Sequence, residues 1–315
     1  MLTYLLRRLL FALALVFTVS SGSLLLTRLT PGDYASEALG IGANRERLAE
    51  MRARYGLDRP VFDQYRDWLA GTLRFDFGRS LAYDRPVSDL IPERAANTAI
   101  LAVTALALAT LVGLPLGIVS GSRPSGAVTS LIRAGSVVLL SMPPLLTSLL
   151  LVFIAARTGW FPIGGMQSGA TGGAAVLDLL HHLVVPALAL ALPLAAMFER
   201  LQSEAMHEVI GQPYVTAALA RGVPRSRVVW RDAFKAALSP VASVYGLVVG
   251  SLLSGSFAVE MITTWPGLGL LMLEALRARD VYLVAGCAAT GSVFLACGTL
   301  LSDVALALVD PRARE

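Results

Sequence analysis

Charged residues, lysine, cysteine and histidine are all scarce in this chain of 315 residues. Only 15% of the residues are charged and 55% are hydrophobic, whereas soluble domains carry about 25% charged residues, so the composition predicts an integral membrane protein. The only lysine, Lys235, follows no glycine-rich turn, which argues against a phosphate-binding P-loop. The three histidines form no cluster at metal-ligand spacing. A transporter built on this chain would therefore take its energy from a partner protein.

The two cysteines give no sign of a disulfide or of a redox pair. Cys287 and Cys297 lie ten residues apart in one apolar segment. On a single helix this separation is too long for a disulfide, so we expect both to serve in packing.

Six apolar segments approach the length of about 20 residues that a membrane-crossing helix needs. They cover residues 9–29, 97–120, 134–156, 183–198, 241–259 and 281–302. The first is longer than the usual apolar run of a signal peptide, so we expect it to be retained. None of the segments has a charged residue in its interior, which argues against an ion-coupled carrier or a channel with rings of charged side chains. The sequence predicts an all-α, polytopic membrane protein with six transmembrane helices.

Basic residues are concentrated on one side of a six-span chain. They occupy the N-terminal end, the loop between spans two and three, the loop between spans four and five, and the tail. The positive-inside rule assigns this side to the cytoplasm, so both termini are expected inside. The predicted organisation is a first span over residues 1–29, an extracytoplasmic insert over 30–96, a transmembrane core over 97–308 with a cytoplasmic loop at 200–240, and a cytoplasmic tail over 309–315.

The extracytoplasmic insert is expected to fold into helices. One helix is predicted near residues 45–55, where Gly56 ends it, and a second is predicted from around Pro60, a residue favoured at the first helical position. Apolar residues of the second helix recur at helical spacing and predict a buried face. They are Val61, Tyr65, Trp68 and Leu69.

The cytoplasmic loop between spans four and five contains a basic segment, residues 213–240, which we name the knob. Its positive residues are Arg221, Arg225, Arg227, Arg231 and Lys235, against one acidic residue, Asp232. Gly222 tolerates the positive φ angle of a sharp helix end, so a short helix over 214–220, a break at 222–224 and a second helix from Ser226 are expected. Small alanines before the break permit close approach of another protein, and the basic side chains can bond its carboxylates. A basic helix resting on anionic lipid is an equal alternative on composition alone.

The knob resembles the coupling loop of the permease subunits of binding-protein-dependent ABC importers, in the dipeptide, oligopeptide and nickel branch. That loop reads Glu-Ala-Ala, three residues, then Gly. Ala217 and Ala218 match the two alanines, Gly222 matches the glycine, Pro240 matches the proline that ends the loop, and Thr216 replaces the glutamate. Asp232 stands where the branch often has histidine. Further short motifs of the family occur in the same order: TPGD at 30–33, YGLDRPVFDQYRDWL at 55–69, SMPP at 141–144, TTWPGLG at 263–269 and DPR at 310–312.

The resemblance implies a type I ABC-importer permease in a bacterial inner membrane, and no enzyme activity of its own. It implies four kinds of partner: the lipid bilayer, a homologous second permease, two ATP-binding subunits inside, and a substrate-binding protein outside. No nucleic acid is expected, and this chain is expected to hold neither a metal nor a cofactor, because ATP and Mg²⁺ belong to the partner subunits. The residues expected to couple to the ATPases are Thr216, Ala217, Ala218, Ala220, Arg221, Gly222, Arg225 and Pro240.

Two further groups of residues are candidates for contacts between subunits. The resemblance places the turn after the fifth span near an outer gate or the binding protein, with a plain interfacial turn as the alternative. Its residues are Trp265, Pro266, Gly267 and Gly269. In the fifth span, Gly246, Gly250 and Ser254 recur every four residues and allow close helix packing, either against the second permease or within the chain's own bundle.

The cargo is the least determined part of the sequence interpretation. Di- and oligopeptides are expected, because uncharged spans suit peptides whose ends vary in charge. Nickel chelates, glutathione, opines and oligosaccharides stay open as alternatives that the same machinery transports. A self-contained secondary carrier would need an ion site, and a membrane-embedded enzyme would need a convergent polar set; the sequence offers neither.

Overall fold

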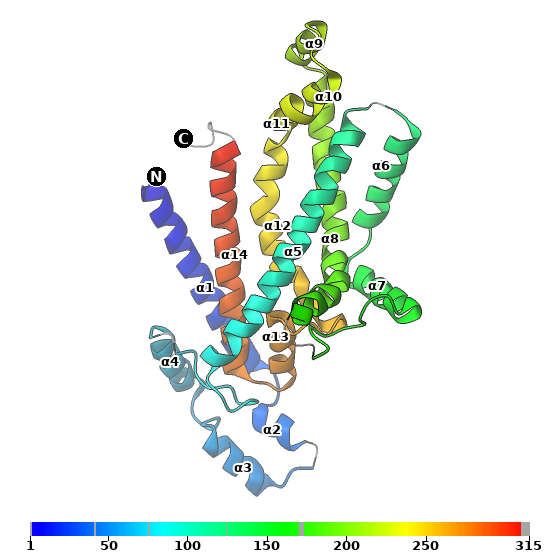
Figure 1. The fold of residues 1–315 in the computed structure, drawn as a ribbon. Helices are drawn as coiled ribbons and strands as arrows, with labels where there is room; N and C mark the ends of the chain where they lie inside the picture. Colours follow the sequence, from blue (N-terminus) through cyan, green and yellow to red (C-terminus); the bar gives the residue numbers. More distant parts are fainter. Residues whose placement is uncertain (1, 41, 75, 124, 170–172, 310–315) are drawn as a thin grey trace. The chain divides into compact units, whose positions relative to one another are not determined.

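The regular secondary structure is helical in the part of the chain that the computed structural model describes, residues 2–40, 42–74, 76–123, 125–169 and 173–309 (Figure 1). Within these ranges the only extended pairing is an isolated bridge between Arg79 and Pro86, which confirms the all-α prediction. The helices are α1 (Leu2–Leu29), α2 (Tyr34–Leu39), α3 (Arg45–Arg54), α4 (Val61–Thr72), α5 (Val87–Gly121), α6 (Ala127–Leu140), α7 (Pro144–Thr158), α8 (Gly173–Ile210), α9 (Pro213–Ala220), α10 (Arg225–Arg227), α11 (Phe234–Ala237), α12 (Ser239–Ile262), α13 (Leu268–Arg277) and α14 (Val281–Val309), with a π-helical turn, η1, at Val228–Ala233. The DPR motif at 310–312 and the side chain of Ser254 lie outside the described residues.

Four of these helices are long and apolar enough to cross a membrane by themselves. Their qualifying segments are Leu6–Leu29, Val87–Gly121, Ala174–Ile210 and Val281–Leu300. Two bent pairs of helices also qualify, so the described residues contain four candidate spans, or six if each pair is one span. The chain is therefore a multi-pass membrane protein. α8 continues through Pro186 and Pro193, so the short predicted span 183–198 is the middle of a much longer helix.

The third predicted span, 134–156, is not one straight helix. α6 ends at Leu140, α7 begins at Pro144, and the two helices are bent by 105°. The cause lies in the sequence, since Pro143 and Pro144 carry no N–H group for a helical hydrogen bond. The residue before a proline is also disfavoured in helical conformation. The prediction of one continuous span there is corrected to a bent pair of helices, which is either a broken span or a re-entrant loop.

Two acidic residues lie inside long helices, just past the ends of the predicted spans. Glu199 follows segment 183–198 and lies in α8, and Glu260 follows segment 241–259 and lies in α12. Their exposed fractions are 2% and 0%. The expectation of spans without a charge in their interior therefore holds for the segments as drawn from hydropathy, where Arg28 lies next to the end of the first one. It does not hold for the helices that contain these segments.

One compact unit consists of residues 1–98 and 266–296. In this unit Trp68 of α4 is buried against Leu24 of α1 and Ala285 of α14, with Tyr65 and Leu69 beside it. This packing confirms the predicted apolar face of α4 except at Val61, which is exposed. Gly56 follows α3 with φ +63°, as predicted, whereas Pro60 precedes α4 and is not part of it.

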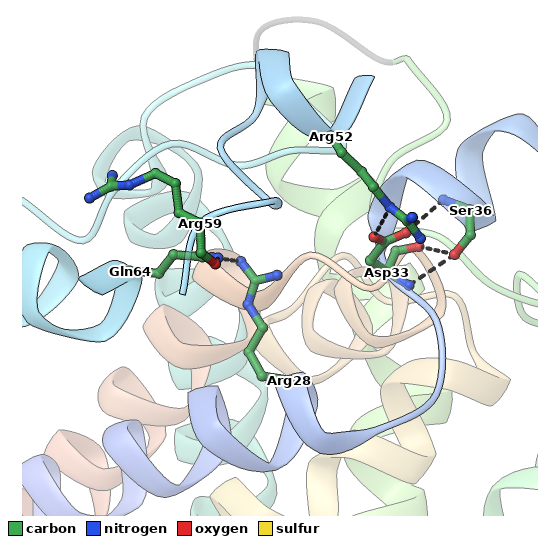
Figure 2. Close-up of polar contacts among 6 residues, drawn as sticks. All are labelled: Arg28, Asp33, Ser36, Arg52, Arg59 and Gln64. Carbon is green, nitrogen blue, oxygen red and sulfur yellow. Dashed lines mark hydrogen bonds and ion pairs between the residues drawn. The ribbon is translucent and has the colours of Figure 1, made fainter. Parts of the chain in front are cut away.

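Polar contacts join the insert to the end of α1 and connect helices within the insert (Figure 2). Arg28 at the end of α1 donates a hydrogen bond to Gln64 Oε1 of α4, and Gln64 Nε2 donates to the carbonyl of Arg59 at 2.7 Å. Asp33 caps α2 by accepting from the Ser36 N–H at 2.9 Å, and its other carboxylate oxygen accepts from Arg52 Nε at 2.6 Å. One carboxylate thus holds α2 and α3 together.

Acidification is expected to loosen this contact between α2 and α3. Partial burial acts to raise the pKa of Asp33, but hydrogen bonds from Arg52 and Ser36 outweigh it and hold the pKa below its ordinary value. The stabilisation is therefore present above the unfolded pKa of about 3.9 and is lost as pH falls through the lower, folded pKa. Hydrogen exchange of the α2 and α3 amides, compared between about pH 6 and pH 3 after correction for the intrinsic rates, measures it. Asp33→Asn should lose protection already at pH 6 and show little further loss in acid; an equal acid loss in both proteins would contradict the assignment to Asp33.

The second compact unit consists of residues 99–265 and 297–315. Its core contains Leu101 of α5, Phe198 of α8, Val248 of α12 and Trp265, which follows α12. The ring of Phe198 stacks on that of Tyr245, with ring centroids 5.1 Å apart.

A row of three glycines, which we name the glycine seam, brings α5 against the backbone of α8 in this unit. A Cβ atom added to Gly113, Gly117 or Gly121 would lie 2.6, 2.7 or 2.4 Å from the carbonyl oxygen of Ala195, Glu199 or Ser203, respectively. These distances are shorter than van der Waals contact, so only glycine fits. Small residues four apart let membrane helices approach in this manner.

Candidate functional site

The first half of the knob is a short helix that ends in a glycine turn. α9 begins at Pro213, whose missing N–H is not needed at a first helical position. After Ala220 the chain reverses at Gly222, which has φ +81°, and the Val223 N–H donates to the Ala218 carbonyl at 3.2 Å. An added Cβ on Gly222 would meet no atom of the described residues within 4 Å. Glycine is therefore required here for its backbone angle and not for space.

The second half of the knob packs one face on its own unit and leaves the other face exposed. α10, η1 and α11 follow one another from Arg225 to Ala237, as the sequence predicted from Ser226 onward. Val229, Ala233 and Ala237 are buried against Ile118 of α5 and Met206 of α8. The exposed face carries Arg227, Trp230, Arg231 and Lys235.

Most of the predicted coupling residues lie at the surface of the knob. Ala218 is half-buried. The exposed residues are Thr216, Ala217, Ala220, Arg221, Gly222, Arg225 and Pro240. The turn brings 216–222 together, whereas Pro240 lies at the start of α12. Their role in contacting an ATPase stays a prediction.

Arg225 also makes a contact within its own chain that the sequence could not show. Its Nη2 donates to the carbonyl of Ser122, just past the end of α5, at 3.2 Å. Unpaired carbonyls at a helix end are commonly bonded by basic side chains. Arg225 therefore connects the knob to the end of a membrane helix.

Sequence reasoning passed over three large apolar side chains on the knob, Tyr214, Leu219 and Trp230. They are 48%, 41% and 51% exposed. Aromatic residues are common among the side chains that dominate protein interfaces, so an apolar contact is available beside the basic one. The periodicity of so short a segment does not reveal which apolar residues face outward.

The turn after the fifth span is largely buried. Trp265 is completely buried in the core of the second unit, and Gly267 is also buried. Pro266 and Gly269 are half-buried, and the Pro266 carbonyl accepts a hydrogen bond from Asn97 Nδ2 at 2.9 Å. Trp265 thus presents no surface for direct contact with another protein in this conformation, and a role for the turn as an outer gate stays a prediction.

The two described members of the small-residue stripe in α12, Gly246 and Gly250, are buried within the chain. A Cβ added to Gly298 of α14 would lie 2.6 Å from a methyl of Val249 and 3.6 Å from the N atom of Gly250. This contact favours packing within the chain's own bundle, the second of the two alternatives. The glycine seam of α5 was missed, although its spacing of four is equally visible in the sequence.

Comparison with known proteins gives matches along the whole chain. The family model described as the inner membrane component of binding-protein-dependent transport systems matches residues 113–315, and a model for the N-terminal part of such components matches residues 1–102. The oligopeptide transport system permease protein AppB of Bacillus subtilis is 32% identical over 99% of both chains. A putative peptide permease protein of Brucella suis is 33% identical over 100% of this chain and 99% of its own. A probable peptide ABC transporter permease protein of Sinorhizobium fredii is 30% identical over 99% of both chains.

Proposed function

Because the chain belongs to the family of inner membrane components of binding-protein-dependent transport systems, we propose that it forms half of the pathway through which an ATP-driven importer moves di- and oligopeptides. It is a permease subunit of an ABC importer. The proposal goes further in naming the cargo, the coupling surface and the partners.

The observation that carries the coupling role is the form of the knob. Its inner face is fixed to α5 and α8, while its exposed face holds basic and aromatic side chains around the turn at Gly222. In the proposed cycle, ATP binding closes two ATPase subunits, the knob follows them, and the spans switch between outward-facing and inward-facing states. Such a switch requires that each partner bind one state better than the other.

The remaining parts of the proposal concern the surroundings of the chain. A homologous second permease completes the pathway, and a substrate-binding protein delivers cargo from outside. ATP and Mg²⁺ are bound by the ATPase subunits, so this chain carries out no bond chemistry. Both termini and the knob lie in the cytoplasm, as the distribution of arginines indicates.

Tagged chain, purified from its native membrane in mild detergent, is expected to bring with it a second permease and P-loop ATPases, identified by mass spectrometry. Gly222→Arg should reduce recovery of the ATPases roughly tenfold or more, because a non-glycine residue at φ +81° distorts the turn and a bulky side chain there obstructs docking. Gly126→Arg is the matched control, since Gly126 is also exposed, has φ +144° and, among the described residues, has no atom within 4 Å of an added Cβ. Recovery of the chain alone, or equal loss in both variants, would contradict the coupling role.

The cargo is tested by uptake. Cells without this chain should take up a radiolabelled tripeptide several-fold more slowly than cells that contain it, while their uptake of labelled nickel and of glutathione stays unchanged. A defect in nickel or glutathione uptake with normal tripeptide uptake would replace peptides by that cargo and leave the importer assignment intact.

A further inference from the structure

Three polar side chains are buried at the glycine seam, near the end of α5. Ser120, Glu199 and Gln202 are 0%, 2% and 0% exposed. The Ser120 hydroxyl of α5 donates to Glu199 Oε1 of α8 at 2.5 Å, whereas neither Nε2 nor Oε1 of Gln202 has a partner among the described residues. Glu199 and Gln202 are three residues apart and lie on the same face of α8. A buried amide without a partner is costly and requires an explanation.

The same end of α5 is connected to the knob. Arg225 donates to the Ser122 carbonyl at 3.2 Å, and Arg133 of α6 donates to the Ser120 carbonyl at 3.3 Å. Ile118 of α5, one helical turn before Ser122, packs with buried residues of η1 and α11. Any displacement of the knob therefore acts on the helix end that carries Ser120.

The glycine seam determines which displacement the two helices can make. Because Gly113, Gly117 and Gly121 have no side chains, α5 meets the α8 backbone without interlocking ridges. Small sliding of packed helices is a known form of switching in proteins. A short slide along the seam would break the hydrogen bond between Ser120 and Glu199 and would bring new groups of α5 past Gln202.

We propose that Ser120, Glu199 and Gln202 are positioning residues that set the balance between the two states of the transport cycle. The hydrogen bond from Ser120 to Glu199 stabilises the state described here. The Gln202 amide has no partner among the described residues in this state and gains one in the other, after α5 has moved along α8. The proposal rests on the proposed function, since the knob supplies the force, and the three residues touch neither cargo nor nucleotide.

The test uses the complete importer in lipid nanodiscs, with Cys287 and Cys297 replaced by alanine. Spin labels at Leu111→Cys in α5 and His207→Cys in α8, both at exposed positions, report the distance between the two helices by pulsed electron paramagnetic resonance. Samples without nucleotide and samples trapped with ATP and vanadate are compared. Wild type should show a second distance population that the nucleotide increases.

The variants are expected to shift that population in opposite directions. Ser120→Ala and Glu199→Gln should each increase the ratio of the second state to the first about tenfold without nucleotide, because the hydrogen bond between Ser120 and Glu199 is lost in the one and weakened in the other. Gln202→Met, of similar size but without hydrogen-bonding groups, should decrease the ratio by a similar factor. It removes the cost of burying an amide without a partner in the first state, and it also removes the hydrogen bond that this amide gains in the second state. Glu204→Gln is the matched control, since Glu204 is exposed and pairs with Arg200 on the same helix.

The opposite signs separate positioning from a general structural role, which would move all three variants in one direction. The proposal is overturned if Ser120→Ala and Gln202→Met shift the ratio of the two states in the same direction, or if neither variant shifts it. If Glu199→Gln does not assemble, Ser120→Ala, the mildest change, tests the same hydrogen bond. If wild type assembles with its ATPases and hydrolyses ATP but the helix distance does not respond to nucleotide, this inference fails and the proposed function stands. If no ATPase assembles with wild type, both fail.

Discussion

Replacing Gly121 with leucine is expected to prevent the chain from accumulating as a folded protein. An added Cβ at this position would lie 2.4 Å from the Ser203 carbonyl oxygen, 2.9 Å from the Ser203 Cα and 2.7 Å from the Met206 Cβ. Two of these atoms belong to the backbone of α8, which cannot rotate away as a flexible side chain would. Overpacking a core costs about 1–3 kcal/mol when side chains can adjust, and separating two helices along the seam costs more.

The measurement is the yield of monodisperse protein in size-exclusion chromatography after mild solubilisation. Gly135→Leu is the matched control, because Gly135 also lies within an apolar helix, α6, but an added Cβ there meets no atom within 4 Å in the described part of the chain. We expect Gly135→Leu to give close to the wild-type yield. Similar yields for both leucine variants would show that α5 and α8 do not depend on this contact.

Replacing Asp280 with alanine is expected to release the segment of the insert before α5 from the start of α14. Asp280 is completely buried. Its Oδ2 accepts from the Ser80 hydroxyl at 2.6 Å and from the Ala82 N–H at 3.0 Å, and its Oδ1 accepts from the Leu283 N–H at 3.1 Å. Hydrogen bonds to charged groups contribute about 1.5–3 kcal/mol each, so losing all three should cost about 3 kcal/mol or more.

Limited proteolysis with trypsin measures this release, because the Arg79–Ser80 bond adjoins the anchored residues. Cleavage at this bond should be faster in Asp280→Ala by about two orders of magnitude if cleavage follows local opening. Asp280→Asn keeps an acceptor for Ser80 and should fall between wild type and Asp280→Ala. Asp58→Ala, at an exposed position of the insert, serves as the control; an equal increase in that variant would assign the effect to charge and not to the anchor.

The features of the fold that local sequence determines were predicted well. Long apolar runs predicted the membrane helices, and Gly222 predicted a sharp end to α9, which its φ of +81° confirms. The bend at residues 141–143 was not predicted, although Pro143 and Pro144 are visible in the sequence. A proline can either kink a helix or end it, and Pro186 and Pro193 do not interrupt α8 at all. The packing around each proline decides between these outcomes, and a hydropathy profile carries no information about that packing.

The contacts of the candidate site depend on residues far apart in the sequence. Glu199 stands at the edge of a hydropathy window, where a charge is ordinarily taken as the end of a span, and its partner Ser120 is 79 residues away. Likewise, spacing identifies the glycines of both α5 and α12 as small-residue stripes without saying what each one contacts. The sequence predicts that close packing occurs, and only the folded chain shows which helix is the partner.

The break between α6 and α7 differs electrostatically from the helix ends that bind anions. An ordinary helix N-terminus presents several free N–H groups, and these attract phosphate and carboxylate groups. At the start of α7, Pro143 and Pro144 have no N–H, and the Thr147 N–H is already bonded to the Pro143 carbonyl at 3.1 Å. The first turn of α7 therefore keeps few amide donors. A carboxylate that reached this break would gain little from it, whereas the negative end of the α6 dipole beside it would attract an ammonium group.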